Sequence, residues 1–103
     1  MLLLAAWALL GIGLACSGKA RPHSVTLTWD VPTAASGITV VGYNVYRSTT
    51  SGGPFVKIAS RVAGPPYEDH LVVSGHVYFY AVTSLDQSGR ESRFSAETKA
   101  VIP

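Results

Sequence analysis

Apolar and polar residues alternate along most of the chain after residue 23. Residues 24–30 read Ser-Val-Thr-Leu-Thr-Trp-Asp, so Val25, Leu27 and Trp29 fall on one side and polar residues fall on the other. A period of two residues is typical of a strand with one buried face. The pattern therefore predicts a strand at 24–30, with Trp29 in the core.

Five later segments are also rich in strand-forming residues, and clusters of Gly, Pro, Ser and Asp separate them. They cover residues 40–48, 55–60, 67–73, 76–85 and 93–103. No segment after residue 16 has a convincing period of 3.6 residues, which argues against helices. Short strands with turn signals at this spacing predict an all-β fold, an antiparallel β-sandwich.

The alternation also predicts which aromatic side chains are buried. In the segment 40–48, Tyr43 shares a face with Val41 and Val45, whereas Tyr46 lies on the opposite face. Large aromatic side chains on the apolar face of a strand dominate sandwich cores. The expected structural core is Trp29, Tyr43, Val45, Tyr78, Tyr80 and Val82. Tyr46 is predicted either to pair across strands with an outward residue such as Phe79, or to belong to an exposed aromatic surface.

The N-terminus has a different pattern, because residues 2–15 are uncharged and almost wholly apolar. This run of 14 residues is shorter than the roughly 20 residues that a membrane-spanning helix needs. We therefore predict that residues 1–15 form a signal peptide or apolar leader with a short helical segment, although no Lys or Arg precedes the run. The alternative is an ordinary buried helix.

Cys16 is the only cysteine and directly follows this apolar run. Its position resembles the lipidation site of a bacterial lipoprotein, but Gly13 stands where that pattern prefers leucine. Gly13 and Ala15 also suit an ordinary cleavage site, and a retained leader is a third possibility. Cys16 is thus a candidate for lipidation and membrane attachment, and residues 16–22 are predicted to form a linker.

Three segments together resemble a known family. They are Trp29 in the first predicted strand, Gly-Tyr-Asn-Val-Tyr-Arg at 42–47, and Tyr-Phe-Tyr-Ala-Val at 78–82. In this order and spacing they are similar to a bacterial fibronectin type III domain over residues 23–103. The resemblance implies an immunoglobulin-like sandwich in which the Tyr78 hydroxyl bonds upstream backbone. It also implies a strand before residue 24, which the sequence leaves short or missing. Residues 86–92 lack the Arg-Gly-Asp motif of some family members.

Charge and motifs exclude several kinds of function. Eight basic and six acidic residues give a net charge of +2 without a basic cluster, so nucleic-acid binding is not expected. Glu68 and Asp69 are adjacent, so in a strand they face opposite ways and form no catalytic pair. His23, His70 and His76 lack metal-binding spacing. We predict no catalytic residues, no metal and no cofactor.

Two functions remain open. The first is a non-catalytic, exported module for protein interaction or spacing at the bacterial cell envelope, either lipid-anchored or secreted. The second is a carbohydrate-binding accessory domain associated with polysaccharide-degrading enzymes. The second function requires exposed, coplanar aromatic rings, for which Tyr46, Phe55 and Phe79 are the candidates. The partner is therefore expected to be a protein or a cell-wall or other polysaccharide.

Overall fold

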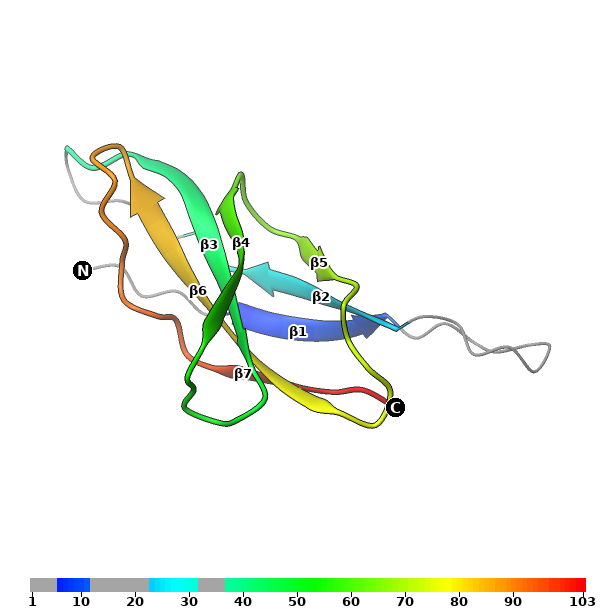
Figure 1. Cartoon of the computed structure of the whole chain (residues 1–103). Coiled ribbons are helices and arrows are strands. Elements are labelled where there is room, and N and C mark those ends of the chain that lie inside the picture. The colour runs from blue at the N-terminus through cyan, green and yellow to red at the C-terminus, as the bar shows by residue number, and fades with distance from the viewer. Residues whose placement is uncertain (1–5, 12–22, 32–36) are drawn as a thin grey trace.

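The computed structural model describes residues 6–11, 23–31 and 37–103, which contain seven strands arranged in two antiparallel sheets (Figure 1). The strands are β1 (Ala6–Gly11), β2 (Ser24–Trp29), β3 (Val40–Ser48), β4 (Val56–Val62), β5 (Tyr67–Asp69), β6 (Val77–Asp86) and β7 (Thr98–Val101). One sheet has the order β1-β2-β5 and the other has the order β4-β3-β6-β7. The predicted all-β sandwich is therefore confirmed. The described residues include no helix long and apolar enough to cross a membrane.

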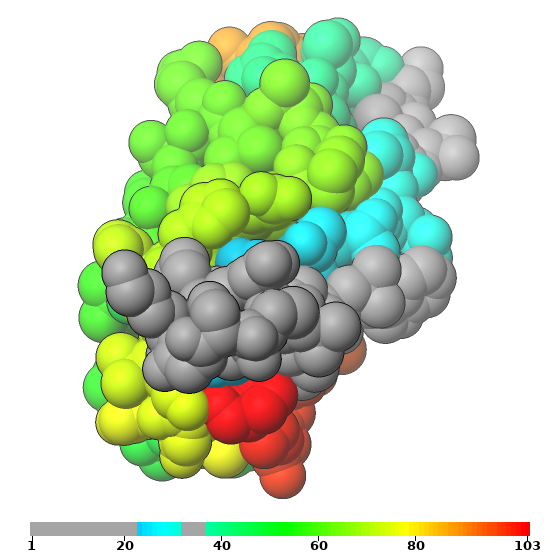
Figure 2. Space-filling view, turned by 90° about the vertical axis from the view of Figure 1, so that its right-hand side faces the viewer, coloured from blue at the N-terminus to red at the C-terminus, as the bar shows by residue number. Residues whose placement is uncertain are grey.

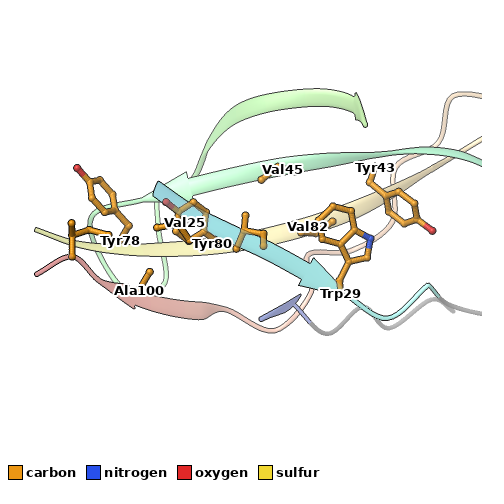
Figure 3. Close-up of a cluster of buried hydrophobic side chains, with 10 residues drawn as sticks. Val25, Trp29, Tyr43, Val45, Tyr78, Tyr80, Val82 and Ala100 are labelled. Atoms are coloured by element: carbon orange, nitrogen blue, oxygen red, sulfur yellow. The ribbon is translucent and has the colours of Figure 1, made fainter. Parts of the chain in front are cut away.

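The core lies between the two sheets, and β2 contributes to it by strict alternation. Val25, Leu27 and Trp29 are at most 3% exposed, while the residues between them are only half-buried. The Trp29 and Tyr43 rings pack at 5.4 Å between centroids at one end of the core, and Tyr78 lies at the other end (Figure 3). The buried cluster contains all six core residues expected from the sequence: Trp29, Tyr43, Val45, Tyr78, Tyr80 and Val82.

The prediction for Val41 is wrong. Alternation predicts that Val41 shares the buried face of Tyr43, but its side chain is 43% exposed. The pairing of β3 with β6 shifts register between Val40 and Gly42, and such an irregularity interrupts the alternation of faces. Gly42 also lies so close to β4 that a side chain there would meet the Arg61 backbone at 3.1 Å.

The N-terminal segment differs most from the sequence-based expectation. The helical form predicted for the leader does not hold for Ala6–Gly11, because these residues form β1 and pair with β2. A strand in this place satisfies backbone groups that an open edge of β2 would leave unpaired. The strand that was expected to be short or missing before residue 24 is thus supplied by residues predicted to be a leader. Cys16 and the rest of the segment 12–22 lie outside the described residues.

Candidate functional site

Three aromatic side chains gather on the outer face of the four-stranded sheet, the face turned away from the core. We call Tyr46, Phe55 and Phe94 the outer aromatic cluster. The Tyr46 and Phe94 rings lie 4.8 Å apart, and the Phe55 and Phe94 rings lie 5.4 Å apart. Phe94 is the most open of the three, with 52% of its surface exposed. This cluster is the candidate site for a ligand on the described surface.

The geometry of the rings limits what the cluster can bind. The Tyr46 and Phe94 rings meet edge to face at 89°, and the Phe55 and Phe94 rings are inclined by 41°. Edge-to-face packing is a favourable arrangement for two aromatic rings in contact with each other. The three rings therefore do not form a flat surface on which a sugar could stack.

The carboxylate of Glu91, close to Tyr46 of the cluster, accepts hydrogen bonds from strands β3 and β6. Three side chains donate hydrogen bonds to one Glu91 oxygen, Oε2: Asn44 Nδ2 at 3.0 Å, Thr83 Oγ1 at 2.6 Å, and the Tyr46 hydroxyl. Asn44 and Tyr46 come from β3, Thr83 comes from β6, and Glu91 lies in the connection between β6 and β7. We call these four residues the Glu91 junction. It fastens that connection to the outer face.

The electrostatics of the Glu91 junction suit a fixed structural contact. Burial and the hydrogen bond to Glu91 raise the pKa of Tyr46 to about 12. Partial burial would raise the pKa of Glu91, but the hydrogen bonds from Thr83, Tyr46 and Asn44 outweigh it and lower that pKa below its ordinary value. At neutral pH the tyrosine keeps its proton and the carboxylate stays ionised. The pair is therefore poorly suited to exchange a proton with a substrate.

The structure brings together only part of the predicted aromatic set. Tyr46 and Phe55 both contact Phe94, but Phe79 lies opposite Ser48 and Lys99. The residue opposite Tyr46 in β6 is Ala81, so the expected cross-strand pair with Phe79 is wrong.

Sequence reasoning missed Phe94 because it was assigned to a strand from residue 93. Strand β7 begins only at Thr98, and Phe94 lies in the connection that precedes it. The polar run at 86–92 signalled a loop at that point, but no pattern in the sequence indicated that the loop is followed by a return across the sheet.

A second polar cluster lies between the sheets. Asp69 Oδ2 accepts hydrogen bonds from Arg47 Nη1 and from the Tyr80 hydroxyl, both at 2.7 Å. Asp69 is only 3% exposed and belongs to β5, whereas Arg47 and Tyr80 belong to the other sheet. We call these three residues the Asp69 clamp. Burial and the contact with the Asp69 carboxylate raise the pKa of Tyr80.

Tyr78 is held near this clamp. Its hydroxyl accepts a hydrogen bond from the Val73 N–H at 3.0 Å, which ties down the segment before β6. The Arg47 guanidinium lies 5.4 Å from the centre of the Tyr78 ring. The hydrogen bond has the form that the family resemblance implied for Tyr78.

The histidines and acidic residues do not assemble into a metal site in the part of the chain that the structure describes. No group of three His, Cys, Asp or Glu side chains lies close enough together there to hold an ion. His70 Nε2 lies 3.1 Å from Glu68 Oε2, and both side chains are more than half exposed. This contact is an exposed pair, a type that contributes little to stability.

Two antiparallel sheets packed around one core define the class of this protein as an immunoglobulin-like β-sandwich. An Fn3-like protein from Clostridium thermocellum is 36% identical in sequence, with a TM-score of 0.66, and the match covers 97% of this chain and 88% of that one. The chain belongs to the fibronectin type III family. No family model matches the sequence.

Two relatives are similar over most of this chain but much larger. The amylopullulanase of Thermoanaerobacterium saccharolyticum is 40% identical over 87 residues, and that of Thermoanaerobacter thermohydrosulfuricus is 44% identical over 86 residues. Each match covers 84% of this chain. The chain spans only 6% and 5% of the length of these relatives. The similarity is therefore to one small segment of each enzyme.

Proposed function

We propose that this chain is a non-catalytic, exported fibronectin type III module that acts as a spacer or protein-interaction domain alongside polysaccharide-degrading enzymes. The support for this setting is the similarity of the chain to a segment of two amylopullulanases. The name of those relatives denotes polysaccharide-degrading enzymes.

The observation that carries the proposal is that the outer aromatic cluster and the Glu91 junction share Tyr46 and consist of groups that are already in contact with one another. Phe94 packs against both other rings of the cluster. Tyr46 contributes its ring to the cluster and its hydroxyl to Glu91. Groups engaged in this way hold a connection against the sheet, and their inclined rings offer a sugar no flat surface. This geometry favours a rigid module over a sugar-binding surface.

The ionisable groups argue against a catalytic role. A glycosidase needs a carboxylic acid of raised pKa to protonate the leaving oxygen. The pKa values of Asp86, Glu91 and Glu97 are all lowered, mainly because hydrogen bonds to each carboxylate outweigh its partial desolvation. Asp69 is buried and engaged by Arg47 and Tyr80. None of these four carboxylates suits the role of the acid.

A second candidate function is carbohydrate binding, and one observation favours it. Phe94 exposes half of its surface beside the half-buried Phe55, and Lys57 Nζ lies 5.8 Å from the centre of the Tyr46 ring. An exposed ring flanked by polar side chains is a feature of sugar-binding surfaces. The inclination of the rings weighs against this function but leaves a contact through Phe94 alone to be tested.

Native gel electrophoresis through immobilised pullulan, amylopectin or pectin separates the two functions. We expect the mobility of the wild-type chain to be unchanged by any of the three, and we expect no release of reducing sugar. The matched control is Phe94→Ala, which removes the exposed ring. Retardation of the wild type that is lost in Phe94→Ala would replace the spacer proposal with carbohydrate binding. Sugar release by the purified chain would overturn the non-catalytic role.

Export and lipid attachment form the remaining part of the proposal. Cleavage behind Ala15 would leave Cys16 at the new terminus, and several acyl chains acting together hold a protein on a membrane. Intact-mass measurement of protein expressed in a bacterial host should show a chain that starts at Cys16 and carries a diacylglycerol-type adduct. Cys16→Ser should abolish the adduct. An unmodified cysteine at that terminus would leave a secreted module without an anchor.

A further inference from the structure

The edge of β2 is covered by an unusual neighbour. β1 pairs antiparallel with β2 over six consecutive residues without a register shift, from Ala6 opposite Trp29 to Gly11 opposite Ser24. The two strands run side by side in Figure 1. The residues of β1 belong to the apolar run that the sequence marks as a leader. The same six residues are thus predicted to be removed and observed to complete a sheet.

β2 depends on this neighbour along half of its length. On the other side, β5 pairs only with Val25, Thr26 and Leu27 (Figure 2 shows β2 in cyan beside the lime-coloured β5 region). Ser24, Thr28 and Trp29 are therefore paired through β1 alone among the strands that the structure describes. Because Trp29 is in the core, loss of β1 would open the sheet next to the hydrophobic interior.

The sequence of β1 is poorly adapted to a permanent edge position. Along β2, Thr26 and Thr28 alternate with the core residues, and Leu9 and Trp7 stand opposite them in the register. A strand with one solvent-facing side normally carries polar residues at these positions. Small residues, Ala8 and Ala6, stand opposite Leu27 and Trp29. The edge thus accepts a strand through backbone pairing, with small residues opposite the two bulky core residues.

We propose that the edge of β2 is a strand-acceptor site, which β1 fills until the leader is cleaved and which an extended segment of another polypeptide fills afterwards. The incoming segment pairs antiparallel with β2, with small apolar residues opposite Leu27 and Trp29. Polar residues opposite Thr26 and Thr28 would suit it better than those of β1. This inference names the kind of partner for the proposed interaction module and rests on the export part of that proposal. Addition of a strand to an open sheet edge is an established mode of peptide recognition.

The first experiment opens the site in the full-length chain. Adjacent residues of a strand direct their N–H groups to opposite sides, so the double change Ala8→Pro and Leu9→Pro removes one N–H that faces β2. Of the adjacent Thr28 and Trp29, one directs its N–H to β1, and we expect hydrogen exchange at that amide to become at least about tenfold faster, while β6 stays protected. The matched control is Ala8→Ser with Leu9→Thr, which keeps both N–H groups and should leave exchange close to that of the wild type.

The second experiment fills the opened site with a peptide. The probe is a synthetic peptide with the sequence Lys-Lys-Ala-Trp-Ala-Leu-Leu-Gly-Lys-Lys, which carries the β1 residues between solubilising lysines. It should restore protection of the β1-facing amide of the pair Thr28 and Trp29 in the proline variant and should not bind the wild type, whose site is occupied. A peptide with two central prolines should have no effect. Exchange that remains slow in the proline variant, or that stays fast with the peptide present, would overturn the proposal.

A third measurement covers the case in which the proline variant fails to fold. A variant with the recognition sequence of a site-specific protease inserted between Lys19 and Ala20 is folded and then cut there, which severs β1 from the rest of the chain. Native mass spectrometry should show the N-terminal fragment still bound and then replaced by an excess of the probe peptide. A fragment that leaves while β2 stays protected would refute the acceptor site. These outcomes are independent of polysaccharide binding, so the proposed function can fail separately.

Discussion

Each face of the four-stranded sheet donates hydrogen bonds to a carboxylate from another segment, Asp69 of β5 on the inner face and Glu91 of the β6–β7 connection on the outer face. On the inner face, Asp69 is 3% exposed and receives donors from Arg47 and Tyr80. On the outer face, the exposed Glu91 accepts hydrogen bonds from Asn44, Tyr46 and Thr83. The Asp69 clamp joins the two sheets, whereas the Glu91 junction joins one connection to one sheet. A hydrogen-bonded carboxylate therefore connects the two sheets of the fold on the inner face, whereas on the outer face it holds only a local segment.

The difference shows how burial sets the energetic consequence of a contact. Removing one partner of a buried ion pair leaves a charge that water cannot fully solvate, which is strongly destabilising. Removing an acceptor at the surface lets water replace it, so the loss is smaller. Changes on the inner face should thus reduce the free energy of unfolding of the whole domain, and changes on the outer face should mainly loosen the connection between β6 and β7.

The largest expected effect is that of Trp29→Ala, a substitution in the core between the two sheets. It removes a side chain that is 3% exposed and packs against Tyr43. Truncation of a buried tryptophan costs about 3–5 kcal/mol because a cavity remains. Denaturant unfolding should show a much lower midpoint. The control is Val56→Ala, at a side chain that is 65% exposed. An unchanged midpoint for Trp29→Ala would show that the β2 register is wrong.

The second prediction tests the Asp69 clamp. Asp69→Asn keeps the size of the side chain but leaves Arg47 without its counter-charge. The Arg47 side chain is 24% exposed, so part of that charge remains solvated. We expect a loss of about 2 kcal/mol in the free energy of unfolding, below the value for a fully buried pair. Pairing the change with Arg47→Met should recover part of the loss. A wild-type unfolding curve for Asp69→Asn alone would contradict the role of the clamp.

The third prediction concerns the Glu91 junction and its dependence on pH. Glu91→Gln should cost about 1 kcal/mol at neutral pH, since three hydrogen bonds lose a charged acceptor that is open to water. The pKa of Glu91 is lowered in the folded state from an ordinary value of 4.5. Its stabilisation is therefore fully present above the unfolded pKa and is lost as the pH falls through the folded pKa.

Chemical unfolding of the wild type and Glu91→Gln, measured in parallel between pH 7 and pH 2, checks this prediction. The gap between the two free energies should stay constant down to about pH 5 and then narrow. The neighbouring Lys57→Gln serves as a control, because it removes a nearby charge but no hydrogen bond to Glu91. A gap that widens at low pH would show that the junction forms with a protonated carboxyl.

The smallest expected effect is that of Phe94→Ala. This ring is 52% exposed and contacts Tyr46 and Phe55, so its removal should cost about 0.5–1.5 kcal/mol. Hydrogen exchange should rise in the connection between β6 and β7, including the Val82 amide that donates to Ser95 Oγ, and remain unchanged at Val25 and Leu27 in β2. A loss as large as that of Trp29→Ala would mean that the outer face supports the whole fold.

The features that the sequence predicted well are those with a local signal. Alternation in β2 is uninterrupted, and β6 places Tyr78, Tyr80 and Val82 two residues apart, so Trp29, Tyr80 and Val82 could be assigned to the core from their spacing. Val41 could not be assigned correctly, because the register shift that reverses its face depends on how β3 meets β6. A period of two carries information about faces only while the pairing stays regular.

The candidate site was harder to predict because its contacts join distant parts of the chain. Glu91 meets residues 44 and 46, and Asp69 meets residue 47, across separations that no motif spans. Alternation indicated that Glu68 and Asp69 face opposite ways, but it could not indicate that Arg47 forms an ion pair with Asp69. The role of β1 was hidden for a different reason. Its composition indicates a leader, and its place as a strand depends on the edge of β2, which would be unpaired without it.

β3 supplies successive residues to two separate networks. Tyr43, Val45 and Arg47 belong to the space between the sheets, while Asn44 and Tyr46 belong to the outer face. Inserting a single residue between Tyr43 and Asn44 would exchange the surroundings of every side chain beyond it, moving Arg47 into the open and Tyr46 towards the core. Natural relatives of this domain should therefore vary in length in their turns and keep this stretch of five residues free of insertions and deletions.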